Sequence, residues 1–472
     1  MDIFYMRKAF YIIGLLFLLA SCRSYYDVVQ SYHQHLDQND FKGAENQLKK
    51  SRFLKKKRNQ ILLCLELGKT MHLQADYDSS NYYLNKADLL MDEKTVVGDV
   101  SASVLVNEAM TRYKGEDFER VLIHYYKALN YLYLNQPDEA LVEAKRINLR
   151  LNELSDKQIF SGRRYKSDAL AQILMGWVYE KQNNYNDAFI AYRNAIELYT
   201  KNDSTEYMGA AIPEQLKIDL INAADKSGFY PERDEYCRRF NMPFESVRDT
   251  SRSSLVFIWE NGLAPIKQQE DIFLFLVKGA GGVLTFTDKS GTINIPVILP
   301  DDKKDQASKL SDFNTIRVSF PKYVDVPVYY TNLRITHDSS TYVPQLAENV
   351  AYIARVNLKE RFLKEMTYTT SRIVLRKLAE AEIKKQNELA GALFDVAGLV
   401  VEKADTRNWQ SLPSQISYTR IPLTPNSTNT LNLQLNSMNG PSKTDAIRVD
   451  AKSRLQFLDY HTLQHLPPLI VR

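Results

Sequence analysis

The sequence predicts a multidomain α+β protein: an N-terminal α-helical repeat array, then a C-terminal α+β domain with a mixed or antiparallel sheet and a long helical pair. Three observations predict this class. Amphipathic helical segments recur in pairs before about residue 240. From about residue 250 the apolar period shortens to that of strands, with Gly and Pro between the runs. Helical periodicity returns over 344–404, ahead of the last strand-like runs.

Residues 1–21 have the pattern of a secretory signal peptide. Two cations, Arg7 and Lys8, precede an uncharged stretch that is shorter than the roughly 20 apolar residues a membrane-spanning helix needs. The stretch ends in the letters LASC at 19–22, which resemble the lipobox of bacterial lipoproteins. An ordinary N-terminal helix with a core cysteine is the alternative.

The lipobox resemblance implies a covalent lipid on Cys22. In that family the cysteine sulfur receives a diacylglyceryl group, the chain is cut before the cysteine, and the new amine is acylated. A buried methylene contributes about 0.8 kcal/mol and one acyl chain anchors only marginally, whereas two or three chains hold a protein on its membrane. We therefore expect the mature protein to begin at Cys22 and to stay membrane-bound.

The composition is that of an ordinary folded protein, with 25% charged and 44% hydrophobic residues. The net charge of +4 hides a basic run, KKSRFLKKKR at 49–58, whose seven cations leave the rest of the chain acidic. This run is either the solvated end of a helix or a contact for anionic headgroups. We expect no nucleic acid partner, because an exported protein does not normally meet one. Cys64 and Cys237 are expected to be packing residues and not a disulfide.

The clearest helical repeat spans 172–199, and its spacing matches the tetratricopeptide repeat. The small and aromatic residues of that motif stand at the expected offsets: Gly176, Tyr179, Ala188, Tyr192 and Ala195. Weaker copies lie at 63–88, 118–146 and around Ala44. Helix 118–134 has two apolar stripes, which is typical of a helix packed between neighbours. The sequence thus predicts a repeat domain over 22–240, with a plain helical bundle as the alternative.

The second half predicts one α+β domain over 250–472. Strands are expected over 253–335, two helices that form a hairpin over 344–404, and further strands over 415–460. The letters GAGG at 279–282 precede a strand and not a helix, so we interpret them as a turn and not as a phosphate-binding loop.

No catalytic or metal-binding motif is recognisable. The seven histidines form no HExxH pair, and no spacing completes a zinc ligand set. The acids Glu116, Asp117 and Glu119 begin a predicted helix, where they suit the helix dipole. We therefore predict no enzyme activity, no metal and no cofactor apart from the lipid on Cys22; a small-molecule substrate is not expected.

A repeat array offers a concave groove, which commonly binds a peptide or a partner helix. Candidate groove residues are His124, Tyr131, Arg146 and Tyr179, since tyrosine supplies contact area at low entropic cost. Each of them is equally compatible with a place in the core or at the rim.

Several segments together resemble an uncharacterised family of bacterial tetratricopeptide-type lipoproteins. They are the lipobox and the letters YKGEDFERVLIHYYKALNYL, DEALVEAKRIN, LAPIK and RNWQSLP. Members of that family are often encoded beside relatives of the curli-secretion pore lipoprotein and of the lipoprotein activators of penicillin-binding proteins. The resemblance implies a role in envelope assembly. Residues 23–26 contain no acid, which by analogy favours an outer-membrane anchor that faces the periplasm.

The sequence therefore predicts a non-enzymatic scaffold or adaptor in cell-envelope assembly or secretion, which binds a protein partner through its helical groove. One alternative is a glycan-capture lipoprotein of the helical starch-binding type, although strand-rich second halves fit that class badly. Another is an enzyme that acts on the cell wall, which the lack of a catalytic constellation disfavours.

Overall fold

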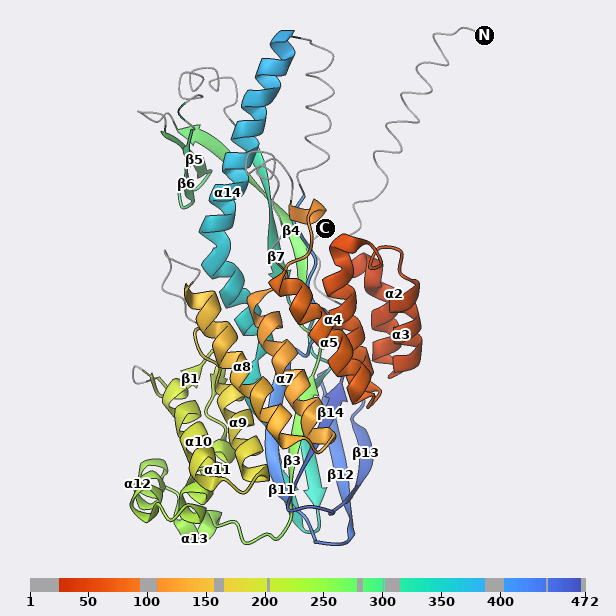
Figure 1. The fold of residues 1–472 in the computed structure, drawn as a ribbon, viewed down its shortest axis with the longest axis vertical. Helices are drawn as coiled ribbons and strands as arrows, with labels where there is room; N and C mark the ends of the chain where they lie inside the picture. The colour runs from red at the N-terminus through yellow and green to blue at the C-terminus, as the bar shows by residue number, and fades with distance from the viewer. Residues whose placement is uncertain are drawn as a thin grey trace.

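The structure is a computed structural model that describes residues 25–93, 108–156, 165–201, 204–277, 283–299, 301, 315–386, 403–438 and 440–467. The predicted signal peptide over 1–21, the predicted lipid site Cys22 and the turn at 279–282 lie outside the described residues. Figure 1 shows the arrangement of the described elements.

The first half is built of helical hairpins, as predicted. The hairpin helices are α2 (Tyr25–Asp37) with α3 (Phe41–Lys50), α4 (Gln60–Leu73) with α5 (Tyr77–Asp92), α7 (Asp117–Tyr133) with α8 (Pro137–Asp156), and α9 (Ala169–Lys181) with α10 (Tyr185–Tyr199). They are followed by α11 (Glu214–Lys226), α12 (Tyr230–Phe240) and the short α13 (Phe244–Val247). Short 3-10 turns, η1 (Lys57–Asn59) and η2 (Glu108–Met110), and a small hairpin of β1 (Glu206–Tyr207) and β2 (Ala210–Ala211) complete this half.

Each hairpin turns in the same way. The turn residues Asn39, Ala75, Asn135 and Asn183 all have a positive φ, between 55° and 59°, so one left-handed residue reverses the chain in every copy. The two helices of the clearest repeat approach so closely that a Cβ added at Gly176 would lie 2.1 Å from Cε1 of Tyr192. The small-residue and aromatic spacing therefore corresponds to a real helix–helix contact.

The second half contains three four-stranded sheets. Sheet one has the order β10 (Gln345–Asn349), β11 (Gln415–Pro422), β3 (Ser254–Asn261) and β14 (Leu455–Thr462), and β14 runs parallel to β3. Sheet two has the order β13 (Lys443–Asp450), β12 (Thr428–Ser437), β8 (Tyr330–His337) and β9 (Ser340–Tyr342). Sheet three has the order β6 (Asn294–Ile298), β5 (Val283–Asp288), β4 (Ile266–Val277) and β7 (Thr315–Val324). Helices and mixed sheets together make the chain an α+β protein.

Over 344–386 the structure has a strand and one helix, where the sequence predicted parts of two helices. Residues 345–349 form strand β10, and one continuous helix, α14 (Val350–Gln386), follows it. The two predicted helices were separated at 367–370, but α14 runs through this stretch, in which Thr370 is fully buried. In Figure 1 α14 extends past the repeats beside β5 and β6. The rest of the predicted second helix, 387–402, lies outside the described residues.

Strand β3 lies in the middle of the molecule, and all of its residues are buried. One face, with Leu255 and Phe257, packs on sheet two, while the other, with Val256 and Ile258, belongs to the core that contains the repeat helices. The helices, sheet one and sheet two are therefore successive layers. The two halves of the sequence share a hydrophobic core.

Candidate functional site

The inner side of the repeat helices is covered by the C-terminal half of the same chain. Trp177 on α9 packs edge-on against Tyr418 on β11 at 5.1 Å between ring centroids. The Tyr199 hydroxyl on α10 donates to the carbonyl of Ala347 on β10 at 2.9 Å. The irregular segment 407–412 is buried throughout and contacts α4 and α7. The concave groove expected to receive a partner is therefore occupied by the protein itself.

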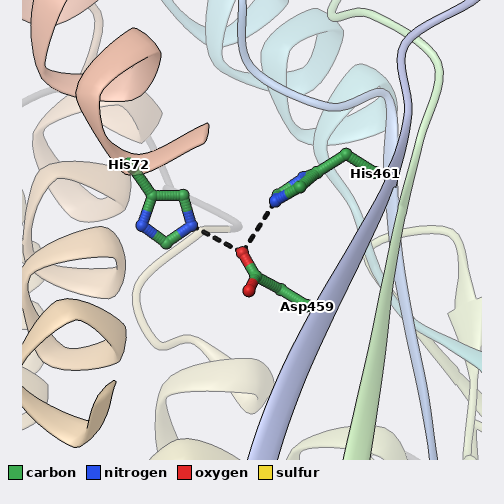
Figure 2. Close-up of side chains that lie close together, drawn as sticks. All are labelled: His72, Asp459 and His461. Atoms are coloured by element: carbon green, nitrogen blue, oxygen red, sulfur yellow. Dashed lines mark hydrogen bonds and ion pairs between the residues drawn. The ribbon is translucent and has the colours of Figure 1, made fainter. Parts of the chain in front are cut away.

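A cluster of ionisable side chains lies at this junction, between the end of α4 and strand β14. Asp459 Oδ2 is 2.6 Å from Nε2 of His72 and 2.7 Å from Nε2 of His461. Figure 2 shows both imidazole rings directed at this one carboxylate oxygen. The other oxygen of Asp459 accepts a hydrogen bond of 2.5 Å from the hydroxyl of Tyr133.

Asn130 on α7 holds the opposite side of the His72 ring. Its Oδ1 is 2.6 Å from His72 Nδ1, and its amide nitrogen donates to Ser80 Oγ and Asn81 Oδ1 at 2.9 Å each. Because the amide nitrogen is committed to two acceptors, Oδ1 faces the imidazole as an acceptor. Nδ1 of His72 therefore carries a hydrogen.

A second buried carboxylate, Glu260 on β3, adjoins the cluster. Its Oε2 accepts from Lys69 Nζ at 2.6 Å and from the Tyr126 hydroxyl at 3.0 Å, and lies 3.1 Å from His461 Nδ1. Burial alone would raise the pKa of Glu260, but the Lys69 ammonium and His461 together outweigh it and hold the pKa at about 2. Glu260 is therefore ionised.

The same balance acts on Asp459 and His461. Burial raises the pKa of Asp459, yet His72 and His461 outweigh this effect and keep the pKa well below its ordinary value. Burial and Lys69 lower the pKa of His461, but the carboxylates of Asp459 and Glu260 more than offset them and raise it. The two buried carboxylates thus stabilise the positive charge of Lys69 and of a protonated His461.

The start of α7 carries a second polar junction. Glu116, which we interpreted as an acid that suits the helix dipole, is buried and ion-paired with Lys267 on β4 and Arg361 on α14. Glu119 closes a capping box with Glu116 and accepts from the backbone N–H of Trp409 at 2.6 Å. The dipole interpretation was incomplete, because these acids connect the repeats to the C-terminal half.

A cavity of about 600 Å³ lies farther from these junctions, between α11, residues 246–252 and β11. Its main charges neutralise one another: Arg420 is 2.8 Å from Glu180 and 3.1 Å from Asp219. Its described lining contains no histidine or cysteine that could act as a nucleophile or base with these acids.

The structure places His124 in the interior and not in a groove. Its side chain is fully buried, and Nδ1 lies 2.7 Å from Glu143 Oε2 on α8. Arg146 reaches the same glutamate at 3.5 Å but is 47% exposed on the outer side of α8. His124 is internal because both stripes of α7 are covered, one of them by α5 and α8.

The other two candidates are half-buried. Tyr131 lies at the end of α7, where burial and then Glu143 raise its pKa. Tyr179 on α9 has the Lys145 ammonium 5.8 Å from its ring centroid. Glu143 therefore contacts both His124 and Arg146. Tyr179 lies next to Lys145 instead. The His72, Asp459 and His461 cluster was missed, because nothing local in the sequence links residues 387 positions apart.

No family model and no curated protein matches this sequence. Among solved structures, similarity is found to MamA, with 17% identity over 46% of this chain and 89% of that chain and a TM-score of 0.29. The apo form of RapI shows 13% identity over 47% and 70% of the two chains, with a TM-score of 0.33. Aspartyl phosphate phosphatase F from Bacillus subtilis shows 16% identity over 46% and 49%, with a TM-score of 0.32. At these scores the likeness carries no argument about function.

Proposed function

We propose that this protein is a lipid-anchored scaffold or adaptor of the bacterial cell envelope, held on the outer membrane by acyl chains on Cys22 and facing the periplasm. The observation that carries the proposal is the lipobox LASC after a short uncharged run. Among the described residues, no helix has both the length and the apolar character needed to cross a bilayer.

Because the C-terminal half covers the inner side of the repeats, we expect a partner to bind their outer side. Helices α5 and α8 are the second helices of adjacent hairpins and are joined by Arg150, 2.8 Å from Asp88. They expose four large apolar side chains, which with Arg146 we call the outer face: Tyr82, Leu89, Val142 and Leu149. Within each helix the two apolar residues are seven positions apart and so lie on one side.

The outer face suits a protein partner better than a polysaccharide. Leu89 is 70% exposed and Leu149 59%, and Arg146 lies between Val142 and Leu149 on the same side of α8. Tyrosine and arginine are enriched in protein interfaces and among the residues that supply most of their affinity, and Tyr82 and Arg146 are of these types. We therefore place the adaptor contact on the outer face, with an envelope protein as its partner.

Affinity capture of the native chain from detergent extracts tests this function. We expect one stoichiometric envelope protein, which the double variant Leu89→Glu/Leu149→Glu loses. Leu363→Glu, a change at a leucine on α14 that is also exposed, is the matched control and should keep it. Capture without a stoichiometric partner, or equal loss in the control, would refute the outer-face contact, and heat released on titration with soluble polysaccharide would favour glycan capture instead.

A further inference from the structure

We propose that His72, Asp459 and His461 form a binding site for one divalent transition-metal ion of the zinc class, which fastens the repeat helices to strand β14. The ligand atoms are the two Nε2 nitrogens and Oδ2 of Asp459, which all lie within 4.8 Å of one another. Figure 2 shows the three side chains converging from two elements. Two imidazoles and a carboxylate are a ligand set that zinc uses in proteins.

The oxygen atoms next to Nδ1 of each imidazole leave Nε2 as the nitrogen that faces the metal position. A ligating histidine presents the lone pair of one nitrogen and usually donates the other N–H to an oxygen. Nδ1 of His72 faces Asn130 Oδ1 at 2.6 Å, and Nδ1 of His461 faces Glu260 Oε2 at 3.1 Å. In both rings Nε2, which donates to Asp459 in this structure, is then the nitrogen that coordinates the ion after it has released its proton to solvent.

The charges nearby also favour a cation. In the metal-bound form both imidazoles are neutral, and Asp459 and Glu260 then supply two negative charges against one positive charge on Lys69. His72 also lies in the last turn of α4, where the helix dipole presents its negative end. One excess negative charge and this helix end stabilise a bound dication.

Only a small adjustment is needed to admit the ion. The nitrogen–oxygen separations of 2.6 and 2.7 Å are those of hydrogen bonds. Tetrahedral zinc with bonds of about 2.0 to 2.2 Å sets its ligand atoms roughly 3.3 Å apart, so each pair widens by less than 1 Å. The His72 side chain is fully buried, whereas the Asp459 side chain is 10% and the His461 side chain 13% exposed. The ion therefore enters from the side of Asp459 and His461. A water molecule suits the fourth position.

Metal analysis of the purified full chain tests the site. After equilibration with buffered Zn²⁺ and removal of free ion, we expect about one zinc per chain in the wild type and in His337→Gln, the control at a buried histidine on β8. His461→Gln and Asp459→Asn should lose most of it. No bound zinc in the wild type, or full occupancy in both cluster variants, would overturn the site.

A measurement on the unmodified protein covers the case in which a variant does not fold. Co²⁺ in place of Zn²⁺ should give the intense visible bands of a four-coordinate ion, and X-ray absorption at the zinc edge should show two imidazoles. A six-coordinate spectrum, or scattering without imidazole, would overturn the proposal. Since the metal is measured directly, either result leaves the adaptor function and its partner test unaffected.

Discussion

Lys69 on α4 and Glu260 on β3 form an ion pair of 2.6 Å in which both side chains are completely buried. The two residues are 191 positions apart, and Tyr126 covers the ammonium with its ring at 4.1 Å. The pair joins the central strand to the helical repeats, so the two halves of the chain depend on each other.

Removing one member of this pair should be far more costly than replacing both. Lys69→Met leaves the Glu260 carboxylate buried without its cation, and we expect it to lower the free energy of unfolding by about 3 to 5 kcal/mol. The double variant Lys69→Met/Glu260→Gln should recover much of that loss. Urea denaturation measures both, with Lys322→Ala as the control, because the Lys322–Glu270 pair is exposed and worth under about 1 kcal/mol. An equal loss in the single and double variants would contradict this account.

The effect of Gly176→Ala on the free energy of unfolding should change sign with the residue at position 192. In the wild type the added Cβ would meet the Tyr192 ring at 2.1 Å, so we expect a loss of about 1 to 3 kcal/mol from overpacking. In a Tyr192→Ala background the clash is gone, and the same change should stabilise α9 by up to about 1 kcal/mol, because alanine is the better helix former. Thermal unfolding of the four proteins checks this, and additive effects would show that the contact is absent.

Protonation of Glu66 should make the protein more stable in weak acid. Burial raises the pKa of Glu66 to about 7, although hydrogen bonds from Gln410 and Tyr25 oppose this. Between the ordinary value of about 4.5 and 7 the folded state holds a proton that the unfolded chain has lost. Stability therefore falls as the pH rises through this window, by about 3 kcal/mol at most.

Glu66→Gln removes this titration while keeping an oxygen that can accept from Gln410 N at 3.0 Å. We expect a flatter stability profile between pH 4.5 and 7, with part of the slope left to Glu119, whose pKa burial also raises to about 7. Urea denaturation across this range measures the slope. An unchanged slope in the variant would show that Glu66 is ionised in the folded state.

Replacing the predicted lipid site should release the protein from the membrane. Cys22→Ser keeps the apolar run but lacks the sulfur that carries the diacylglyceryl group, so the product should move from the membrane pellet to the soluble fraction. Cys237→Ser, at another free cysteine, is the control. Mass spectrometry of the wild type should find an acylated residue 22 at the N-terminus. An unmodified N-terminal methionine on a dissolved wild-type protein would refute the anchor.

Local patterns predicted the local structure well. The small and aromatic residues of 172–199 predicted the hairpin of α9 and α10, because a glycine opposite a tyrosine is a requirement of two helices in contact. A continuous β-rich run predicted β3, and further such runs between Gly and Pro predicted strands after it. The separation predicted at 367–370 is absent, and Thr370 is buried there by packing, which overrides its weak helix propensity.

The sequence by itself determined the helical repeats and the strands, since each is encoded in residues a few positions apart, and it predicts the secretory start in the same way. Tertiary structure alone decided that the chain fills its own groove, that His124 is internal, and that His72 meets Asp459 and His461. The contacts between the two halves join residues hundreds of positions apart, and they depend on how the layers pack. No local period carries that information.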